Sequence, residues 1–403
     1  MMVNNVTSTR KLPLAGVKIV DFTQVQFGPM ATQILADFGA DVIKVERPGL
    51  GDISRSIDVK ADGVEDSSSF LAFNRNKRSL VLDMKREGAL EIVHRLLEDA
   101  DVLVANFRAG VAQRLGLGYD DLKDRYPRLI YASGTGFGES GPLAELGGQD
   151  MVLQSMSGTL WHHRDEAGRP RIYPTSFIDF GAGMAITQGI LLALIERGVS
   201  GKGQRVDVSM IDTAVFFQAQ EYTGWMMRRF ELHWERDNLV GVFRTSDGWV
   251  TVVGLFRPDP LRAVCDALGI DGVAEQAEFA SQSLIIENRA HLWGILEAHF
   301  SRYRTEEVVA RLAQANVLCG PVFNYDDVIA HPQIMENQTF RELTHPKVGN
   351  VKVVDTPIRL SASRDAQMFN APPLLGQHTS EVLNWLGYSD EEIDAMRESG
   401  LID

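Results

Sequence analysis

The feature that most constrains this chain is the regular alternation of short apolar stretches with helix-like ones. Residues 17–46 read as the apolar VKIVDF, a break at QVQFGP, the helically spaced MATQILADFGA and the apolar DVIKVE, which predicts a strand–helix–strand unit. The same order continues with SLVLDM, a helix over 88–100, DVLVANF, a short helix near 119–126 and RLIYASG. Such alternation predicts an α/β fold with a mostly parallel sheet that helices cover on both faces.

Polar or small residues follow each predicted strand, at points where a buried sheet would otherwise stay apolar. In parallel α/β sheets, ligands bind beyond the carboxyl ends of the strands, so these segments are candidates for a binding site. They comprise residues 21–26, 46–47, 83–85, 106–107 and 134–137.

The second half of the chain has a different pattern. Residues 181–198 are apolar nearly all round, which predicts a helix buried between other elements. The stretch VGVFRTSDGWVTVVG alternates about a turn at Asp247-Gly248 and predicts an antiparallel hairpin in a separate module. The remaining predicted elements are helices over 211–230, 259–268, 286–300 and 305–315, a strand at 350–355 and two C-terminal helices, TSEVLNWLG and SDEEIDAM.

Charge and cysteine content argue against several classes of protein. The 40 Lys and Arg residues and 54 Asp and Glu residues give a net charge of −14, whereas duplex nucleic-acid binding needs a basic face. The two cysteines, Cys265 and Cys319, cannot build a disulfide framework or a four-cysteine zinc site. The sequence has no apolar run of signal-peptide length at its start and no window of ~20 apolar residues. We therefore expect a cytoplasmic protein with no nucleic-acid or membrane partner.

Basic residues nevertheless gather near the predicted strand ends, which in an acidic chain suggests a phosphate-binding cluster. Solvated surface charges are the alternative interpretation. Recurrence after successive strands favours a ligand, whereas the absence of GxGxxG and GxxxxGK[ST] disfavours dinucleotide and P-loop sites. The residues are Arg75, Lys77, Arg78, Lys85 and Arg86, with Arg47, Arg55, Arg108 and Arg114 in neighbouring segments.

Asp179 is the acidic residue of most interest, because it lies in SFIDFGAGM at the predicted start of the long helix. It has two interpretations, a helix N-cap and a catalytic carboxylate. Gly181 and Gly183 cost helix stability and permit close approach of a ligand, which favours catalysis. A helix N-terminus favours the anionic form, which suits a nucleophile.

Other polar pairs are weaker candidates. Gln149-Asp150 follow two glycines and are interpreted as a helix start, with a site as the alternative. His162 and His163 are adjacent, so their side chains point in different directions and a shared metal site is disfavoured. Neither HExxH nor GxSxG occurs. We expect no metal.

Motifs along nearly the whole chain, from about residue 14 to the C-terminal helices, resemble one known family. They are LAGVKIVDFTQVQFGPMATQILADFGADVIKVERPGLGD, NRNKRSLVLDMK, ADVLVANFRAG, GGQDMVLQSMSG, DFGAGM and PLLGQHT, in this order. The resemblance is to the family III CoA transferases, which include formyl-CoA transferase, carnitine CoA-transferase and 2-methylacyl-CoA racemase.

The resemblance implies an interlocked homodimer, in which two chains are threaded through one another like linked rings. Each chain would have a large doubly wound domain built from both termini and a smaller α+β middle domain. The expected bounds are 1–205 for the first part of the large CoA-binding domain, 206–235 for linker helices, 236–325 for the small domain and 326–403 for the return to the large domain.

The resemblance also implies a CoA site and a catalytic residue. The family's catalytic carboxylate falls on Asp179, which would form an acyl-aspartyl anhydride and then an aspartyl-CoA thioester. CoA would be a substrate, exchanged between acyl-CoA and carboxylic acids, with no tightly bound cofactor. The CoA-binding positions fall on Gln26, Arg47, Leu82, Asp83, Met84, Lys85, Asn106, Phe107, Arg114 and Phe137.

Several departures from the family pattern narrow the activity. Gln149 stands where the racemases have a histidine base, and glutamine cannot take a proton from the α-carbon, which disfavours racemisation. The formyl and oxalyl branch has a glycine-rich loop at the positions of residues 238–241 of this chain. That branch also has a tryptophan where this chain has Ile57 and a lysine where it has Thr135. We therefore expect a transferase for another small organic acid or dicarboxylate. An isomerase or racemase using Asp150 and Asp179, and a non-catalytic CoA-binding subunit, stay open as alternatives.

Overall fold

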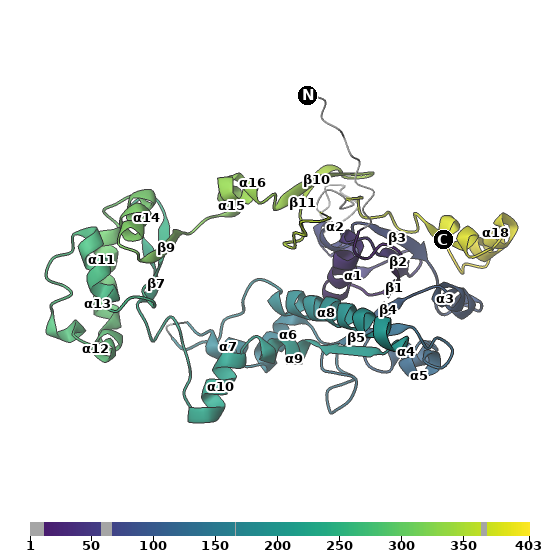
Figure 1. Ribbon diagram of the computed structural model, residues 1–403, viewed down its shortest axis with the longest axis horizontal. Coiled ribbons are helices and arrows are strands. Elements are labelled where there is room, and N and C mark those ends of the chain that lie inside the picture. Colours follow the sequence, from purple (N-terminus) through teal and green to yellow (C-terminus); the bar gives the residue numbers. More distant parts are fainter. Residues whose placement is uncertain (1–11, 58–66, 166, 364–368) are drawn as a thin grey trace, which may run out of the picture. The chain divides into compact units, whose positions relative to one another are not determined.

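The computed structural model describes residues 12–57, 67–165, 167–363 and 369–403 (Figure 1). The chain divides into two compact units. The first combines Met1–Gln218 with Glu336–Asp403, so it is built from both ends of the chain. The second is the continuous segment Ala219–Met335.

The first unit contains a six-stranded sheet in the order β3-β2-β1-β4-β5-β6. All five neighbouring pairs run parallel, which confirms the predicted parallel α/β sheet. The strands are β1 (Lys18–Phe22), β2 (Asp41–Glu46), β3 (Lys77–Val81), β4 (Val102–Ala105), β5 (Ile130–Thr135) and β6 (Arg205–Ser209).

Helices cover both faces of this sheet. The side chains of a strand alternate between the two faces, so each strand contributes to two cores. In β4, Leu103 and Ala105 enter one core, whereas Val102 and Val104 enter the other. The first core also holds α3 (Ala89–Leu97), α17 (Thr379–Trp385) and α18 (Asp390–Glu398). The second holds α1 (Phe27–Asp37) and α8 (Phe177–Ser200), which pack against each other.

Helix α8 buries only one of its faces. Ile178, Ala182, Ile186 and Ile190 repeat at a spacing of four residues and are fully buried. On other faces, Leu192, Ile195 and Val199 are 67, 69 and 90% exposed, so the prediction of an all-round buried helix is wrong for the single chain. Among the described residues, α8 is the one helix long and apolar enough to cross a membrane, and a core helix passes the same test.

The second unit contains the predicted antiparallel hairpin, β7 (Val240–Arg244) and β8 (Trp249–Val253), extended by β9 (Leu318–Pro321). Helices α11 (Pro260–Leu268), α13 (Arg289–Phe300) and α14 (Thr305–Gln314) pack on these strands, as predicted, around a core that includes Phe243 and Phe300.

Shorter elements complete the chain. Those of the first unit are η1 (Ile53–Ser56), α2 (Ser68–Phe73), α4 (Val111–Arg114), α5 (Tyr119–Leu122), α6 (Asp150–Met156), α7 (Thr159–His162), α9 (Met210–Phe216) and the antiparallel pair β10 (Phe340–His345) and β11 (Gly349–Val354). The others are α10 (Ala219–Arg228), η2 (Ala277–Phe279), α12 (Gln282–Glu287), α15 (Tyr325–Ala330) and α16 (Pro332–Glu336).

Candidate active site

A cavity of about 640 Å³ lies at the carboxyl ends of β1, β4 and β5, on the edge of the sheet where a ligand is expected. Its walls come from the loop after β1, residues 106–108 after β4, residues 135–136 at the end of β5, residues 147–149 before α6 and the first turn of α8. Ile53 of η1, Ile57 and Phe73 of α2 add an apolar side. Four predicted site residues line this cavity: Gln26, Asn106, Phe107 and Asp179.

Asp179 lies in the first turn of α8, but it does not cap the helix. Instead, Asp150 of α6 accepts hydrogen bonds at Oδ2 from the N–H groups of Ile178, at 2.8 Å, and Asp179, at 3.1 Å. The other oxygen of Asp150 accepts a 2.7 Å bond from Gln154 Nε2, and the residue is 2% exposed. Among the described residues, none donates a hydrogen bond to the Asp179 carboxylate. The N-cap interpretation of Asp179 is therefore wrong.

Burial raises the pKa of the Asp179 carboxyl to about 7, and the neighbouring charge of Asp150 adds to the rise. The prediction that the helix N-terminus would favour the anion is wrong, because Asp150 accepts the available N–H groups and Asp179 faces a partly apolar cavity. Both protonation states are therefore populated near neutral pH. Titratable groups shifted in this way concentrate at functional sites.

Gly181 and Gly183 permit close packing of helices rather than close approach of a ligand. A Cβ atom at Gly183 would lie 2.5 Å from the backbone oxygen of Phe27, the first residue of α1. A Cβ at Gly181 would lie 2.0 Å from the ring of Phe217. The contact at Gly183 joins the helix that carries Asp179 to the segment that follows the β1 loop.

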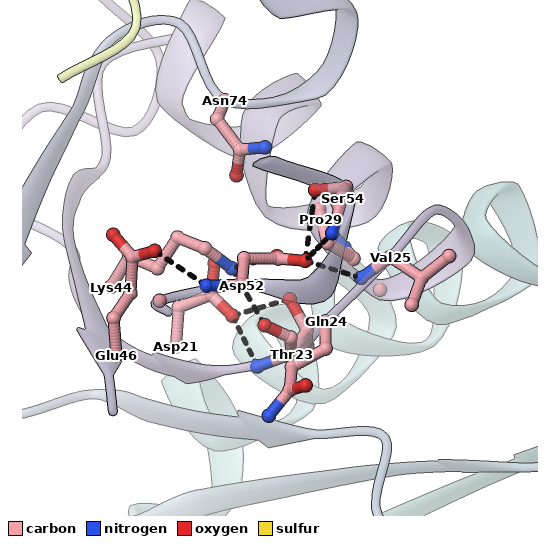
Figure 2. Close-up of polar contacts among 12 residues, drawn as sticks. Asp21, Thr23, Gln24, Val25, Pro29, Lys44, Glu46, Asp52, Ser54 and Asn74 are labelled. Carbon is pink, nitrogen blue, oxygen red and sulfur yellow. Dashed lines mark hydrogen bonds and ion pairs between the residues drawn. The ribbon is translucent and has the colours of Figure 1, made fainter. Parts of the chain in front are cut away.

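The loop after β1 is held by side chains of β1 and of the segments that follow β2 and β4. Figure 2 shows Asp21 of β1 and Asp52, which follows β2. The Thr23 N–H donates to Asp21 Oδ1 at 2.7 Å, and Gln24 exchanges two 2.8 Å bonds between its backbone and the Asn106 side chain. The Val25 N–H donates to Asp52 Oδ1 at 2.9 Å. Val25 has a φ of 70°, a left-handed conformation that costs a β-branched residue about 1–3 kcal/mol.

The expectation that Arg55, Arg75 and Lys77 contribute to a phosphate cluster is wrong, because all three are buried in ion pairs. Arg55 lies 2.8 Å from Glu46, Arg75 lies 2.5 Å from Asp37 and Lys77 lies 3.2 Å from Asp21. Arg75, Lys77 and Arg78 also lie at the amino end of β3, away from the edge that carries the cavity. Arg78 pairs with Asp41 and Glu381.

The other predicted CoA-binding residues lie outside the cavity lining. Arg47, Lys85 and Arg114 are exposed, and Arg47 Nε donates to the Gly51 carbonyl at 3.1 Å. Lys85 and Arg114 have no ion-pair partner in the described part of the chain. The rest are partly or fully packed: Leu82 and Met84 in one core, Phe137 against the other, and Asp83, whose N–H donates to Leu401 O at 2.9 Å.

Sequence reasoning missed several residues that line the cavity, above all Ile53, Ser69 and Ser176. Ile53 stands just beyond the strand-end segment 46–47, so a longer window after β2 could have found it. By contrast, Arg108 was predicted as one of the basic residues near the strand ends; it lines the cavity and has no ion pair among the residues that the structure describes.

This chain is similar to known proteins along almost its whole length, both in sequence and in structure. Residues 14–379 match the family described as CoA-transferase family III. Human succinyl-CoA:glutarate CoA-transferase is 33% identical over 397 residues, which cover 97% of this chain and 90% of the relative. Formyl-CoA:oxalate CoA-transferase of Escherichia coli is 31% identical over 421 residues, covering 97% and 99%. A CAIB/BAIF family protein from Brucella suis has a similar crystal structure, with a TM-score of 0.82 at 31% identity, covering 94% of this chain and all of that one.

Proposed function

Because this chain belongs to CoA-transferase family III and is a CoA-transferase, we propose that it moves CoA between small organic acids with Asp179 as its nucleophile. One observation carries the assignment of Asp179. Its carboxylate lines the cavity at the strand ends and has no hydrogen-bond donor among the described residues, whereas its neighbour Asp150 is fully bonded. The relatives named above act on mono- and dicarboxylates, which supports a carboxylic acid acceptor.

The proposed reaction begins when ionised Asp179 attacks the thioester carbon of an acyl-CoA. The carbon–sulfur bond breaks, CoA leaves as a thiolate, and an acyl-aspartyl anhydride forms. The thiolate then attacks the Asp179 carbonyl carbon, which releases the first acid as a carboxylate and leaves an aspartyl-CoA thioester. The acceptor carboxylate reverses both steps, so the enzyme returns with Asp179 ionised and a new acyl-CoA is released.

The surroundings of Asp179 suit this chemistry. A carboxylate whose pKa is about 7 is more basic than an ordinary one, and it is still mostly ionised above neutral pH. The apolar side formed by Ile53, Ile57 and Phe73 would keep water from the anhydride and the thioester, both of which hydrolyse. Backbone N–H groups at the start of α1, beside Gln26 and Phe27, are our candidates for stabilising the oxyanions.

We further propose that CoA lies across the carboxyl edge of the sheet. Gln26, Asn106 and Phe107 would contact it inside the cavity. Arg47, Lys85 and Arg114, which follow β2, β3 and β4, would bind its phosphates in place of the buried cations. The segment 82–84 and Phe137 would lie beside the bound CoA along the same edge of the sheet.

We propose the interlocked homodimer that the family resemblance implies, and the exposed apolar residues of α8 support a covering partner chain. Leu192, Ile195 and Val199 of α8 and Phe216 of α9 are between 67 and 90% exposed in the single chain. Exposed apolar side chains in this number indicate a surface that another chain covers. A second copy of this chain is the occupant that we propose.

The test compares wild type with Asp179→Ala in an exchange assay between succinyl-CoA and glutarate. We expect Asp179→Ala to lose CoA exchange while it still folds and binds CoA in calorimetry. In wild type, acyl-CoA without acceptor should give an adduct on Asp179 that hydroxylamine removes, seen by peptide mass spectrometry. Full exchange activity of Asp179→Ala would reject the assignment.

The alternative of an isomerase or racemase using Asp150 and Asp179 is less well supported. Asp150 does not line the cavity, and both of its oxygens already accept hydrogen bonds. Incubation of an acyl-CoA in D₂O without acceptor acid separates the two activities, since an isomerase exchanges the α-proton and a transferase does not.

A further inference from the structure

Asp52 joins two walls of the cavity from inside the protein. Its Oδ1 accepts hydrogen bonds from the Val25 N–H at 2.9 Å and from the Ser54 N–H and hydroxyl at 2.8 Å each. Val25 belongs to the loop after β1, and Ser54 belongs to η1, whose first residue Ile53 lines the cavity with Val25. Asp52 is 1% exposed and does not line the cavity itself, so it contacts the walls from behind.

Lys44 of β2 completes this connection (Figure 2). Its Nζ lies 2.8 Å from Asp52 Oδ2 and donates a 2.6 Å hydrogen bond to the Thr23 carbonyl. The side chains of Lys44 and Asp52 are both 0% exposed, so water cannot replace either partner. The ion pair therefore holds the same loop at two points, the Thr23 carbonyl and the Val25 N–H.

The left-handed backbone conformation of Val25 needs contacts that hold it, and Asp52 provides one of them. A φ of 70° is rare for a β-branched residue, and such a backbone persists only where its surroundings hold it. Asp52 supplies the bond to the Val25 N–H. The next residue, Gln26, is the N-cap of α1 and lines the cavity.

The position of this loop affects the proposed nucleophile, Asp179, through helix α1. The backbone of Phe27 packs against Gly183 of α8, one turn after Asp179. A shift of Val25 would therefore move Gln26 and the start of α1 relative to the Asp179 carboxylate.

We propose that Asp52 is a positioning residue for CoA transfer, holding Val25 in its left-handed conformation so that Gln26 and the start of α1 stay in register with Asp179. The inference rests on the proposed function of Asp179. Asp52 acts through Val25 and contacts no substrate.

The test is a double-mutant cycle of Asp52→Asn and Val25→Gly. Asparagine keeps the size of Asp52 but turns an amide NH₂ toward the Lys44 ammonium, so we expect the Val25 bond to weaken. A displacement of about 1 Å in a catalytic site can cost roughly 100-fold, so kcat should fall by about 100-fold with little change in the KM for acyl-CoA. Glycine adopts a φ of 70° without strain, so in the Val25→Gly background the same change should cost less than about 10-fold.

Asp355→Asn is the matched control, because Asp355 is also buried and paired, with Arg341 at 2.8 Å and Arg359 at 3.4 Å, but is not among the described residues that line the cavity. It should leave kcat unchanged in both backgrounds. Equal losses of kcat from Asp52→Asn in the two backgrounds would overturn the proposal, and so would an unchanged kcat. If Asp52→Asn does not fold, Asp52→Glu, which keeps the charge but displaces the carboxylate by one methylene, takes its place with the same expectations.

Amide hydrogen exchange provides a measurement that does not depend on activity. In Asp52→Asn, peptides spanning residues 22–28 should exchange faster than in wild type, and in Asp355→Asn they should not. If wild type moves no CoA from succinyl-CoA to any acid, the proposed function fails. Amide hydrogen exchange alone then decides whether Asp52 holds the loop at Val25. Unchanged protection of residues 22–28 in Asp52→Asn would then overturn the role of Asp52.

Discussion

The buried carboxylates of Asp21 and Asp52, which do not line the cavity, and the carboxylate of Asp179, which does, differ in the partners that they have. Asp21 receives hydrogen bonds from Thr23 and Thr32 and an ion pair from Lys77, and Asp52 receives four such contacts. Asp179 has none from the described residues. Burial acts on all three, so the partners decide what each carboxylate can do.

The pKa values express this difference. Burial alone would raise the pKa of Asp52, but the Lys44 ammonium and the N–H groups of Val25 and Ser54 outweigh it and lower the pKa to about 2. Burial likewise would raise the pKa of Asp21, and Lys77 and Lys44 hold it below its usual value. At Asp179 no group in the described part of the chain opposes burial, and the pKa rises to about 7. Paired acids stabilise the fold, whereas the unpaired acid is kept reactive at a cost in stability.

The largest expected effect is on Asp179. Asp179→Asn should lower kcat by about 10⁴-fold or more, as loss of a nucleophile does. It should also raise the melting temperature at pH 8. The folded pKa of about 7 exceeds the ordinary 3.8, so the native state binds more protons between these values, and wild type loses stability as pH rises through that window. The neutral asparagine has no such loss.

Thermal unfolding of both proteins at pH 4 and pH 8 checks this prediction. A gain of 1 kcal/mol corresponds to roughly 2–4 °C in a domain of this size class. The two melting temperatures should converge at pH 4. A variant less stable than wild type at pH 8 but not at pH 4 would contradict the assignment of Asp179 as an unpaired, destabilising group.

The next largest effect is expected for the paired set. Lys44→Met leaves Asp52 as a buried charge without its cation, which should lower the free energy of unfolding by about 3–5 kcal/mol. Lys123→Met removes an exposed pair with Asp120 and should cost less than about 1 kcal/mol. Urea unfolding measures both, and equal losses would show that the buried pair has no special importance.

Local patterns in the sequence predicted the fold and the edge of the sheet on which the cavity lies. The alternation around 17–46 specifies β1, α1 and β2, because hydrophobic spacing is a property of neighbouring residues. Polar residues after β1 and β4 marked the cavity for the same reason, and Asp179 stood out by its place before a long apolar helix.

Pairing between distant residues could not be predicted in this way. Asp150 caps α8 from 29 residues away, and Arg75 pairs with Asp37 across 38 residues, so neither partner is visible in a local window. The prediction of an anionic Asp179 and of a basic cluster at Arg75 failed on these long-range contacts. The exposed side of α8 was also missed, because composition alone does not show which apolar face meets the same chain.

A smaller effect should follow from the contact between the two acids of α6 and α8. Asp150→Asn removes a charge that raises the pKa of Asp179, so the midpoint of the kcat/KM profile should move from about 7 to lower pH. It should stay above 3.8, because burial is the larger cause and remains. Asp165→Asn, at an exposed turn, should leave the midpoint in place. A midpoint that rises would contradict the charge effect of Asp150.

The smallest expected effect concerns the cations, which can also be compared as buried and paired or exposed and unpaired. Buried Lys44 and Lys77 are paired, whereas Lys85 is exposed and has no ion pair in the described ranges, so it is free to bind a CoA phosphate. An exposed ionic contact is worth about 0.2–1 kcal/mol, so Lys85→Ala should raise the KM for acyl-CoA roughly 1.5–5-fold. The value of kcat should not change, because the contact is the same in the ground and transition states.

An acyl-pantetheine substrate separates phosphate binding from any indirect effect of Lys85. It carries the thioester without the nucleotide phosphates, so Lys85→Ala should leave its KM unchanged, and high salt should abolish the difference seen with acyl-CoA. Arg311→Ala in α14, which removes an exposed pair with Glu307 in the second unit, should affect neither substrate. If Lys85→Ala raised both KM values equally, Lys85 would act on the cavity and not on the phosphates, and the division between paired structural charges and free binding charges would not extend to this residue.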